Sequence, residues 1–335
     1  MPKGGYKAIL VRWSVVVLIS SAVPGCSVRP EALQAYLDST RLRDQGQNDL
    51  AIEKLKQALE ADQAFALAYS GLGRAYLGTG DFAEAEAAFR RATVLDPWSL
   101  PDHVDLARVR QMRERFADAA QAYARAAELA PESAEIQLEA AACCLQAGVP
   151  ARALAHVESA IQIKGRSPEV LRLLGKLHEA RGDYEQALAV YREWSESTPD
   201  MPDGMLAMAL AQSRNGEYDE ARQVLVAVLR KWPGEAAAFR HLAYCLLKLG
   251  DTDGAIEMYE NAIARDADSW QAHRGLGVAY MVKARQTRDD RFQGMALQHW
   301  RWALSLDPDQ PRHDVLQRLI REHSTTGNPL QGLEY

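Results

Sequence analysis

The sequence predicts an all-α fold, a right-handed α-solenoid of eight two-helix hairpins followed by a C-terminal capping helix. Three observations lead to this prediction. The 335 residues are rich in alanine and poor in runs of β-branched residues, which is a helical composition. Residues 32–308 repeat with a period of about 34 residues, and small residues recur at two fixed positions of the repeat. Such units bury their apolar faces only against their neighbours, so they stack into an array.

The small residues mark where the two helices of a hairpin, A and B, approach each other. The repeats start at residues 32, 66, 100, 134, 168, 202, 236 and 270. Position 20 is alanine in every repeat, from Ala51 to Ala296, and the larger residues at position 24 are expected to fill the gap to the next hairpin. Position 8 is Ser39, Gly73, Ala107, Ala141, Gly175, Ala209, Ala243 and Gly277, and position 24 is Leu55, Phe89, Tyr123, Val157, Tyr191, Leu225, Tyr259 and Trp300.

The turns follow the same period. Glycine stands between helices A and B in six repeats, where it can adopt the left-handed conformation that ends a helix. The second repeat reads Tyr69, Leu72, Gly73, Tyr76, Gly80-Asp81-Phe82, Ala85, Phe89, Ala92 and Pro97. With this pattern the chain resembles the tetratricopeptide repeat family. The resemblance implies that helix A lines an inner groove, chiefly through positions 2, 5, 9 and 12, and that the chain binds a partner there.

The eighth repeat departs from the pattern. Extra residues near Gln286–Arg291 separate Tyr280 from Ala296, and they either lengthen a helix or form a protruding loop. Residues 309–323 are predicted to form the capping helix, with Leu316, Leu319 and Ile320 on one stripe. Residues 324–335 are expected to be a flexible tail.

The N-terminus has the order of a signal peptide of the lipoprotein type, assigned to residues 1–25. Basic residues precede an apolar stretch that is too short to span a bilayer. The sequence Val23-Pro24-Gly25-Cys26 resembles a bacterial lipobox, which implies a lipid on Cys26, a linker at residues 26–31 and a membrane anchor. Ser27 favours the outer membrane, facing the periplasm, within the cell envelope. The alternative is an ordinary signal peptide cut nearby, which would leave a secreted or periplasmic soluble protein.

The sequence gives no sign of catalysis, of a metal or of a cofactor. It contains no His-Glu-x-x-His, no Gly-x-Ser-x-Gly and no phosphate-binding glycine loop with lysine. Cys143, Cys144 and Cys245 fall on packed helix faces and are interpreted as small buried hydrophobic residues. The net charge is −6 with no block of one sign, so no nucleic-acid partner is expected. We expect a non-enzymatic protein.

The predicted groove contrasts with this acidic balance. Positions 5 and 9 of the eight repeats hold six basic side chains and no acid. The alternative is that these bases only neutralise acids at the rim of the groove, namely Glu135, Glu169, Glu179 and Asp203. The predicted peptide-binding residues are Tyr36, Arg74, Arg108, Arg172, Lys176, Leu206, Leu210, Arg240, Tyr244 and Arg274.

These observations predict a cell-envelope scaffold or adaptor that binds a partner protein or an acidic, carboxylate-bearing peptide in the groove. In plan it looks similar to tetratricopeptide lipoproteins that assist pilus, secretion or outer-membrane assembly. The alternative is an accessory protein of polysaccharide export or peptidoglycan remodelling that binds glycan or a hydrolase. Sugar-binding grooves usually offer stacked aromatic rings, and here only Tyr36 and Tyr244 would qualify.

Overall fold

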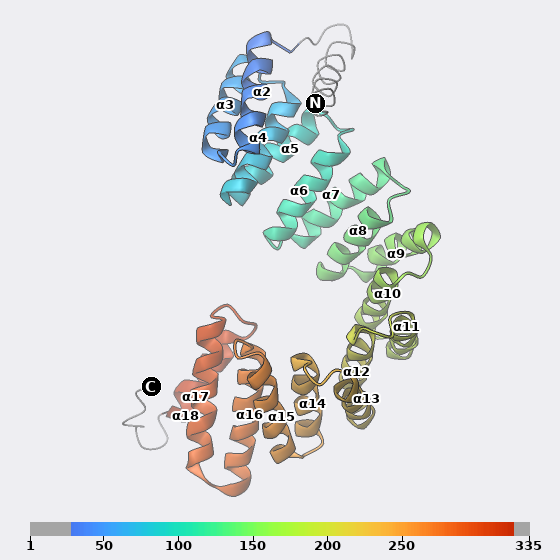
Figure 1. The fold of residues 1–335 in the computed structure, drawn as a ribbon, viewed down its shortest axis with the longest axis vertical. Coiled ribbons are helices and arrows are strands. Elements are labelled where there is room, and N and C mark those ends of the chain that lie inside the picture. The colour runs from blue at the N-terminus through green and yellow to red at the C-terminus, as the bar shows by residue number, and fades with distance from the viewer. Residues whose placement is uncertain (1–27, 325–335) are drawn as a thin grey trace, which may run out of the picture. The chain divides into compact units, whose positions relative to one another are not determined.

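The computed structural model describes residues 28–324 and is entirely helical over that range (Figure 1). Its helices, α2 to α18, form consecutive antiparallel hairpins, as the repeat period predicts. The chain divides after Gly165 into two compact units. At this point the sequence has glycine where five other repeats have proline.

The N-terminal unit consists of four hairpins. Their A helices are α2, α4, α6 and α8, and each is followed by its B helix. The bounds are α2 Pro30–Asp44, α3 Asn48–Ala61, α4 Ala66–Thr79, α5 Phe82–Leu95, α6 Leu100–Met112, α7 Phe116–Leu129, α8 Ala134–Gln146 and α9 Pro150–Lys164.

The C-terminal unit also has four hairpins, and one further helix closes it. The A helices are α10, α12, α14 and α16. The bounds are α10 Pro168–Arg181, α11 Tyr184–Ser197, α12 Asp203–Asn215, α13 Tyr218–Lys231, α14 Ala236–Lys248, α15 Thr252–Arg265, α16 Trp270–Thr287, α17 Asp290–Leu306 and α18 His313–Ser324.

The packing follows the small and large positions of the repeat. All sixteen residues at positions 8 and 20 are buried, and so are all eight larger residues at position 24. The closest approach is at Gly175, where a Cβ atom would lie 2.1 Å from Cε1 of Tyr191. The period of small residues therefore reports a real constraint, since a larger side chain at position 8 would occupy space already filled by an aromatic ring.

The turns between helices A and B use the left-handed conformation throughout. The six glycines have φ between +72° and +89°. In the third and eighth hairpins, which lack this glycine, Glu114 and Arg288 have φ of +57° and +55°. This conformation is unfavourable for any residue other than glycine, because the Cβ atom crowds the backbone.

The extra residues of the eighth repeat extend both of its helices. α16 has 18 residues and α17 has 17, compared with 13 to 15 in the other A and B helices. The lengthened-helix alternative is therefore correct. After this hairpin, α18 buries Leu316 and packs Leu319 and Ile320 against the last core cluster, so it covers the end of the array.

The predicted signal peptide, Cys26 and the tail from Thr325 lie outside the described residues. No described helix is both long enough and apolar enough to cross a bilayer.

Candidate peptide-binding surfaces

In the C-terminal unit, the A helices bring the predicted residues onto one continuous surface. α12 contacts α14, and α14 contacts α16. An ion pair of 2.8 Å between Arg214 of α12 and Glu179 of α10 connects the first two helices. We call the exposed side of these four helices the C-terminal basic surface. Its predicted residues are Arg172, Lys176, Leu206, Leu210, Arg240, Tyr244 and Arg274.

Three cations of this surface form no ion pair with a described residue. Arg172 and Lys176 are exposed and Arg240 is half-buried, and none of them forms an ion pair with any residue between 28 and 324. Burial lowers the pKa of Lys176, and the nearby charges of Arg172 and Arg214 lower it further. Burial also lowers the pKa of the Arg240 guanidinium. Lys176 thus lies close enough to Arg172 for their like charges to repel, and this repulsion exceeds the attraction between Lys176 and the rim acid Glu179.

Apolar groups accompany these cations. Tyr244 is 40% exposed, and its ring contacts Tyr218 edge-on at a centroid distance of 6.2 Å. Lys248 lies over the Tyr244 ring at 5.5 Å. Leu206 and Leu210 are partly buried on the preceding A helix, α12. The surface therefore offers apolar contact between positive charges.

Arg274 is less available than the other arginines. Its Nη1 donates a hydrogen bond of 3.1 Å to the carbonyl oxygen of Pro311, and its guanidinium lies 4.8 Å from the centre of the Trp270 ring. These contacts connect α16 to the segment before the capping helix, so part of its hydrogen-bonding capacity is already in use.

Three residues of this surface were not predicted: Arg214, His241 and Lys248. Arg214 is exposed and lies near Lys176 and His241. His241 is partly buried, and burial together with Arg240 and Arg214 lowers its pKa to about 4. Arg214 and Lys248 both stand at position 13 of their repeats, so reading position 13 together with positions 5 and 9 would have found them.

The N-terminal unit uses the equivalent positions differently. Tyr36 is partly buried, lies against Phe65 at a centroid distance of 5.3 Å and packs on the edge of the first core cluster. Arg74 donates from Nε to Asp105 at 3.0 Å, and its Nη2 lies 3.9 Å from Asp102. Arg108 is exposed and forms no ion pair with a described residue. Arg74 is therefore neutralised, although by acids other than those predicted at the rim.

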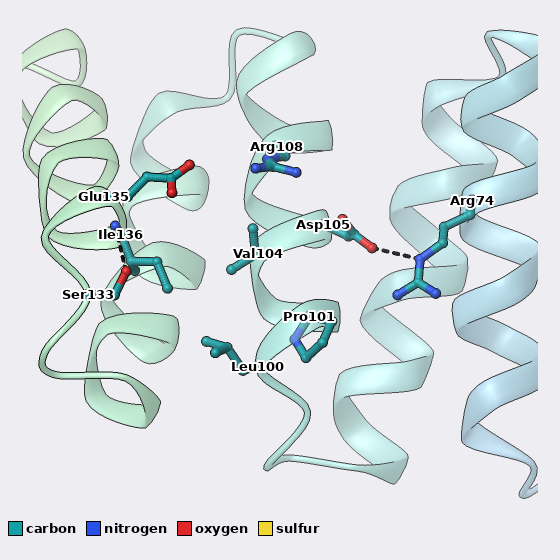
Figure 2. A pocket seen from close by; sticks show the side chains of 9 residues that line it. All are labelled: Arg74, Leu100, Pro101, Val104, Asp105, Arg108, Ser133, Glu135 and Ile136. Carbon is teal, nitrogen blue, oxygen red and sulfur yellow. Dashed lines mark hydrogen bonds and ion pairs between the residues drawn. The ribbon is translucent and has the colours of Figure 1, made fainter. Parts of the chain in front are cut away.

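A hollow of about 450 Å³ opens on the A helices of this unit (Figure 2). Its apolar lining comes from Leu100, Pro101, Val104 and Ile136. The charged groups around it are the Arg74–Asp105 pair, Arg108 and Glu135. Figure 2 shows Arg108 and Glu135 at one end of the hollow and Leu100 with Pro101 at the other. We call this site the N-terminal hollow.

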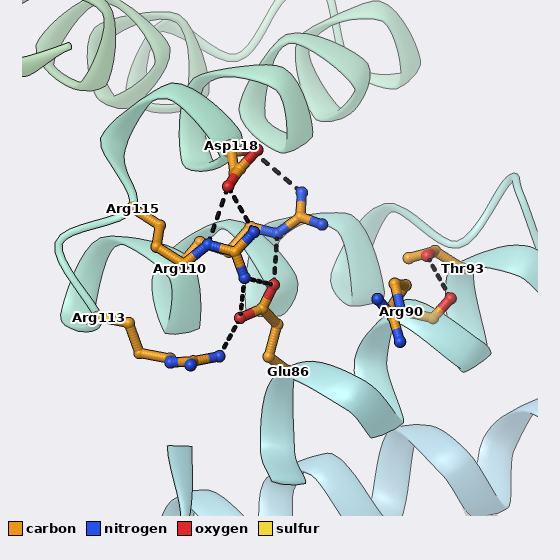
Figure 3. Close-up of polar contacts among 7 residues, drawn as sticks. All are labelled: Glu86, Arg90, Thr93, Arg110, Arg113, Arg115 and Asp118. Carbon is orange, nitrogen blue, oxygen red and sulfur yellow. Dashed lines mark hydrogen bonds and ion pairs between the residues drawn. The ribbon is translucent and has the colours of Figure 1, made fainter. Parts of the chain in front are cut away.

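A second charge cluster of the N-terminal unit has a structural role (Figure 3). Glu86 of α5 is buried and accepts from Arg110 at 3.1 Å, from Arg115 at 2.7 Å and from Arg113. Burial alone would raise the pKa of Glu86, but the three arginines lower it by more. Arg115 also pairs with Asp118 at 2.6 Å. The arginines fasten the turn that contains Glu114 to the preceding hairpin.

No group of three or more His, Cys, Asp or Glu residues in the described part of the chain could hold a metal ion. Cys143, Cys144 and Cys245 are free and buried, as predicted, and burial raises the pKa of each thiol.

Comparison with known families agrees with the repeat pattern. Models described as tetratricopeptide repeat match residues 32–97, 112–177, 145–213, 206–259 and 246–288. The chain belongs to the tetratricopeptide repeat family. Family members are typically non-catalytic scaffolds, and membership supports a protein-binding role in general.

Two solved structures share the fold. A tetratricopeptide repeat protein from Parabacteroides merdae superposes with a TM-score of 0.57 at 15% identity, covering 75% of this chain and 99% of the other. The C-terminal part of a tetratricopeptide repeat-containing protein from Cytophaga hutchinsonii gives a TM-score of 0.53 at 16% identity, covering 72% and 99%. At these identities the likeness concerns the fold alone.

Curated relatives match only in part. The CTR9 homolog of Arabidopsis thaliana is 29% identical over 105 residues, which is 31% of this chain and 10% of that protein. The human protein O-mannosyl-transferase TMTC1 is 25% identical over 151 residues, which is 45% of this chain and 17% of that protein. The chain spans less than a fifth of the length of these two relatives, so their activities do not transfer to it.

Proposed function

We propose that this protein is a non-enzymatic scaffold of the cell envelope that binds an acidic, extended peptide or partner protein on the C-terminal basic surface. The observation that supports the proposal most strongly is that Arg172, Lys176 and Arg240 form no ion pair with a described residue. Keeping like charges together costs free energy, and a bound carboxylate would relieve it. Guanidinium groups also form bidentate, charge-assisted hydrogen bonds with carboxylates.

The apolar residues of the surface favour a peptide over a glycan. Leu206, Leu210 and Tyr244 would contact aliphatic side chains between the acids of the ligand. Of the two aromatic rings predicted to be available for sugar stacking, Tyr36 is partly buried against the core and Tyr244 is exposed. We therefore propose that the ligand is a protein or peptide and that a lipid on Cys26 attaches the scaffold to the membrane. Its role would then be one such as assisting pilus, secretion or outer-membrane assembly.

The ligand chemistry can be tested with two matched probes. The acidic probe is a heptapeptide with blocked ends in which glutamates alternate with glycine–leucine pairs, and the neutral probe has glutamine in place of each glutamate. Hydrogen bonds to charged groups contribute about 1.5–3 kcal/mol each. Replacing Arg172 and Arg240 by alanine should therefore weaken binding of the acidic probe by at least about tenfold in calorimetry.

The control variant should lose two positive charges outside the C-terminal basic surface. Arg192 of α11 and Arg230 of α13 are exposed on B helices of the same unit, and neither has a hydrogen bond or ion pair with a described residue. The Arg192→Ala, Arg230→Ala variant should bind the acidic probe within about twofold of the wild type. Equal losses in both double variants would mean that only net charge matters, and the proposed surface would be wrong.

The membrane anchor has a separate test. Cells labelled with a palmitate analogue should incorporate it into the wild-type protein and not into the Cys26→Ala variant. If the variant is labelled equally, or the wild type is not labelled, the lipid is not on Cys26 and the proposed envelope anchor has to be abandoned.

A further inference from the structure

Position 4 of helix A and position 23 of helix B meet inside a hairpin. In the fourth hairpin these residues are Gln137 and His156, and Nδ1 of His156 lies 2.8 Å from Oε1 of Gln137. In the eighth hairpin they are His273 of α16 and His299 of α17, whose Nδ1 atoms are 3.0 Å apart. Among the eight repeats only the eighth has histidine at both positions, so this pair is a feature of the last hairpin and not of the fold.

A single hydrogen lies between the two rings. Nε2 of His273 lies 3.1 Å from the carbonyl oxygen of Ala267, which can only accept, so this nitrogen carries a hydrogen. Burial lowers the pKa of both rings, so both are neutral at pH 7 and each has one N–H. Nδ1 of His273 therefore presents a lone pair to His299, and Nδ1 of His299 donates to it.

The two rings meet edge to edge and in line. Their centres are 5.3 Å apart and their planes differ by 21°. The centre of an imidazole ring lies about 1.2 Å from each of its atoms. Nδ1 atoms 3.0 Å apart are therefore compatible with centres 5.3 Å apart only if both nitrogens lie close to the line through the two centres. Two nitrogen lone pairs can thus approach one point from opposite sides, which is the arrangement around a linear, two-coordinate metal ion.

The available ligands select the ion. Within residues 28–324 no group of three or more His, Cys, Asp or Glu residues could hold a metal ion, whereas Zn²⁺ takes three or four protein ligands. A monovalent d¹⁰ ion, Cu⁺ or its analogue Ag⁺, is coordinated by as few as two nitrogens. Imidazole suits copper, and a ligating histidine usually donates its other N–H to a carbonyl or carboxylate, as Nε2 of His273 does to Ala267.

Trp302 of α17 completes the surroundings of the pair. Its ring is nearly parallel to both imidazoles, and its centre lies 4.9 Å from that of His273 and 6.4 Å from that of His299. Parallel rings this close cannot lie side by side, so the indole face covers the pair. An ion midway between the two imidazoles would lie about 5 Å from the indole centre, inside the roughly 6 Å over which an aromatic face attracts a cation. Trp302 is 49% exposed, so the pair lies near the surface.

We infer that His273 and His299 bind a monovalent d¹⁰ cation of the Cu⁺ type, with the face of Trp302 against it. The ion replaces the hydrogen between the Nδ1 atoms, and that proton moves through water to Nε2 of His299, so no proton is released. Metal–imidazole bonds are about 2 Å long, so the two nitrogens separate by about 1 Å. His299 is only partly buried and can supply this movement. The inference is independent of the C-terminal basic surface and of the membrane anchor.

The test uses Ag⁺, which needs no reductant to keep it monovalent, and the ¹⁵N-labelled full chain. Silver nuclei have spin one-half, so long-range ¹H–¹⁵N spectra should show the Nδ1 resonances of His273 and His299 each split by coupling to the same ion. Ag⁺ also binds thiols, but silver on a buried cysteine leaves the histidine nitrogens unsplit. The exposed His313 is the internal control, since a single nitrogen exchanges its ion too fast for a splitting to be resolved. Unsplit resonances of the pair in excess Ag⁺ would overturn the inference.

Two variants separate the site from the fold. His273→Gln recreates the Gln137–His156 pair that the fourth hairpin already contains, so it should fold normally. It should bind Ag⁺ at His299 at least about tenfold more weakly, without a splitting, because one of the two ligands is lost. Trp302→Phe keeps both nitrogens, so the splitting should persist, and the weaker attraction of a phenyl face should reduce the affinity by about twofold to fivefold. A splitting or an undiminished affinity in His273→Gln would show that the pair is not the ligand and would overturn the inference.

Discussion

The packing of Gly175 against Tyr191 makes a quantitative prediction about the array. In Gly175→Ala, the added Cβ would lie 2.1 Å from Cε1 and 2.6 Å from Cζ of the ring. Carbon atoms normally approach no closer than about 3.5 Å, so the ring would have to move by more than an ångström. Tyr191 is only 2% exposed, and its hydroxyl donates to Glu179 at 3.2 Å. The ring therefore has little free space to enter, and moving it would disturb this hydrogen bond.

Two effects of opposite sign compete in this variant. Alanine in place of glycine inside a helix stabilises by about 1 kcal/mol. Overpacking a core costs about 1–3 kcal/mol, and weakening a hydrogen bond to a carboxylate adds about 1 kcal/mol or more. We therefore expect Gly175→Ala to destabilise the C-terminal unit by about 1–3 kcal/mol.

The next hairpin suggests a second substitution that should restore the stability lost in Gly175→Ala. That hairpin pairs Ala209 with Leu225, so Gly175→Ala combined with Tyr191→Leu reproduces a pair that the fold already accepts. Tyr191→Phe isolates the hydrogen bond. Hydrogen exchange should show lost protection in α10 and α11 for the single variant, spreading first to adjacent hairpins, and recovery in the double variant. If Gly175→Ala alone raised stability by the 1 kcal/mol of helix propensity, the ring would not occupy that space.

Three further perturbations have expected outcomes. Burial lowers the pKa of His241 and of His299 to about 4, below the ordinary 6.5. The free energy of unfolding should therefore be highest above pH 6.5 and fall toward pH 4, by on the order of 2–3 kcal/mol for each histidine. In denaturant unfolding, the His→Gln variants should show a flatter pH dependence. Glu114→Gly should stabilise the third hairpin by about 1 kcal/mol in the same assay, since glycine adopts φ of +57° without strain, and a destabilisation would count against that reasoning. Glu86→Gln should destabilise by about 2–4 kcal/mol because three arginines lose their common anion, with loss of exchange protection centred on α6 and α7.

The sequence predicted the backbone arrangement well because a repeat fixes where each Cβ atom points. The buried residues at position 24, the left-handed glycines and the capping stripe at Leu316 all follow from spacing alone. The left-handed turns at Glu114 and Arg288 could also have been inferred, since every other hairpin has glycine there. The lengthening of α16 and α17 could not be chosen over a loop, because a charged insertion is compatible with both.

The ion pairs were harder to predict than the packing. Arg74 reaches Asp105 and Glu179 reaches Arg214, over 31 and 35 residues along the chain. Both separations are close to one repeat, so opposite charges at neighbouring positions of consecutive A helices are the signal that was missed. Long side chains have several rotamers, and spacing alone does not say which partner each will select. The prediction that Tyr36 lies in the groove was likewise made without knowing that its ring would pack partly against Phe65.

Whether a cation on an A helix forms an ion pair thus depends on which residue the next A helix places beside it. Arg74 and Lys176 occupy the same position of their repeats, but the residue at position 6 of the following repeat is Asp105 in one case and Ala207 in the other. Ala207→Asp should therefore place a carboxylate beside Lys176 and weaken binding of the acidic probe several-fold without removing any cation. Asp105→Ala should release Arg74 and add weak, salt-sensitive binding of the same probe to the N-terminal unit, detectable at the methyls of Val104. If Ala207→Asp left the affinity unchanged while methyl NMR still placed the probe at Leu206 and Leu210, the absence of an ion pair at Lys176 would not be what makes that surface bind anions.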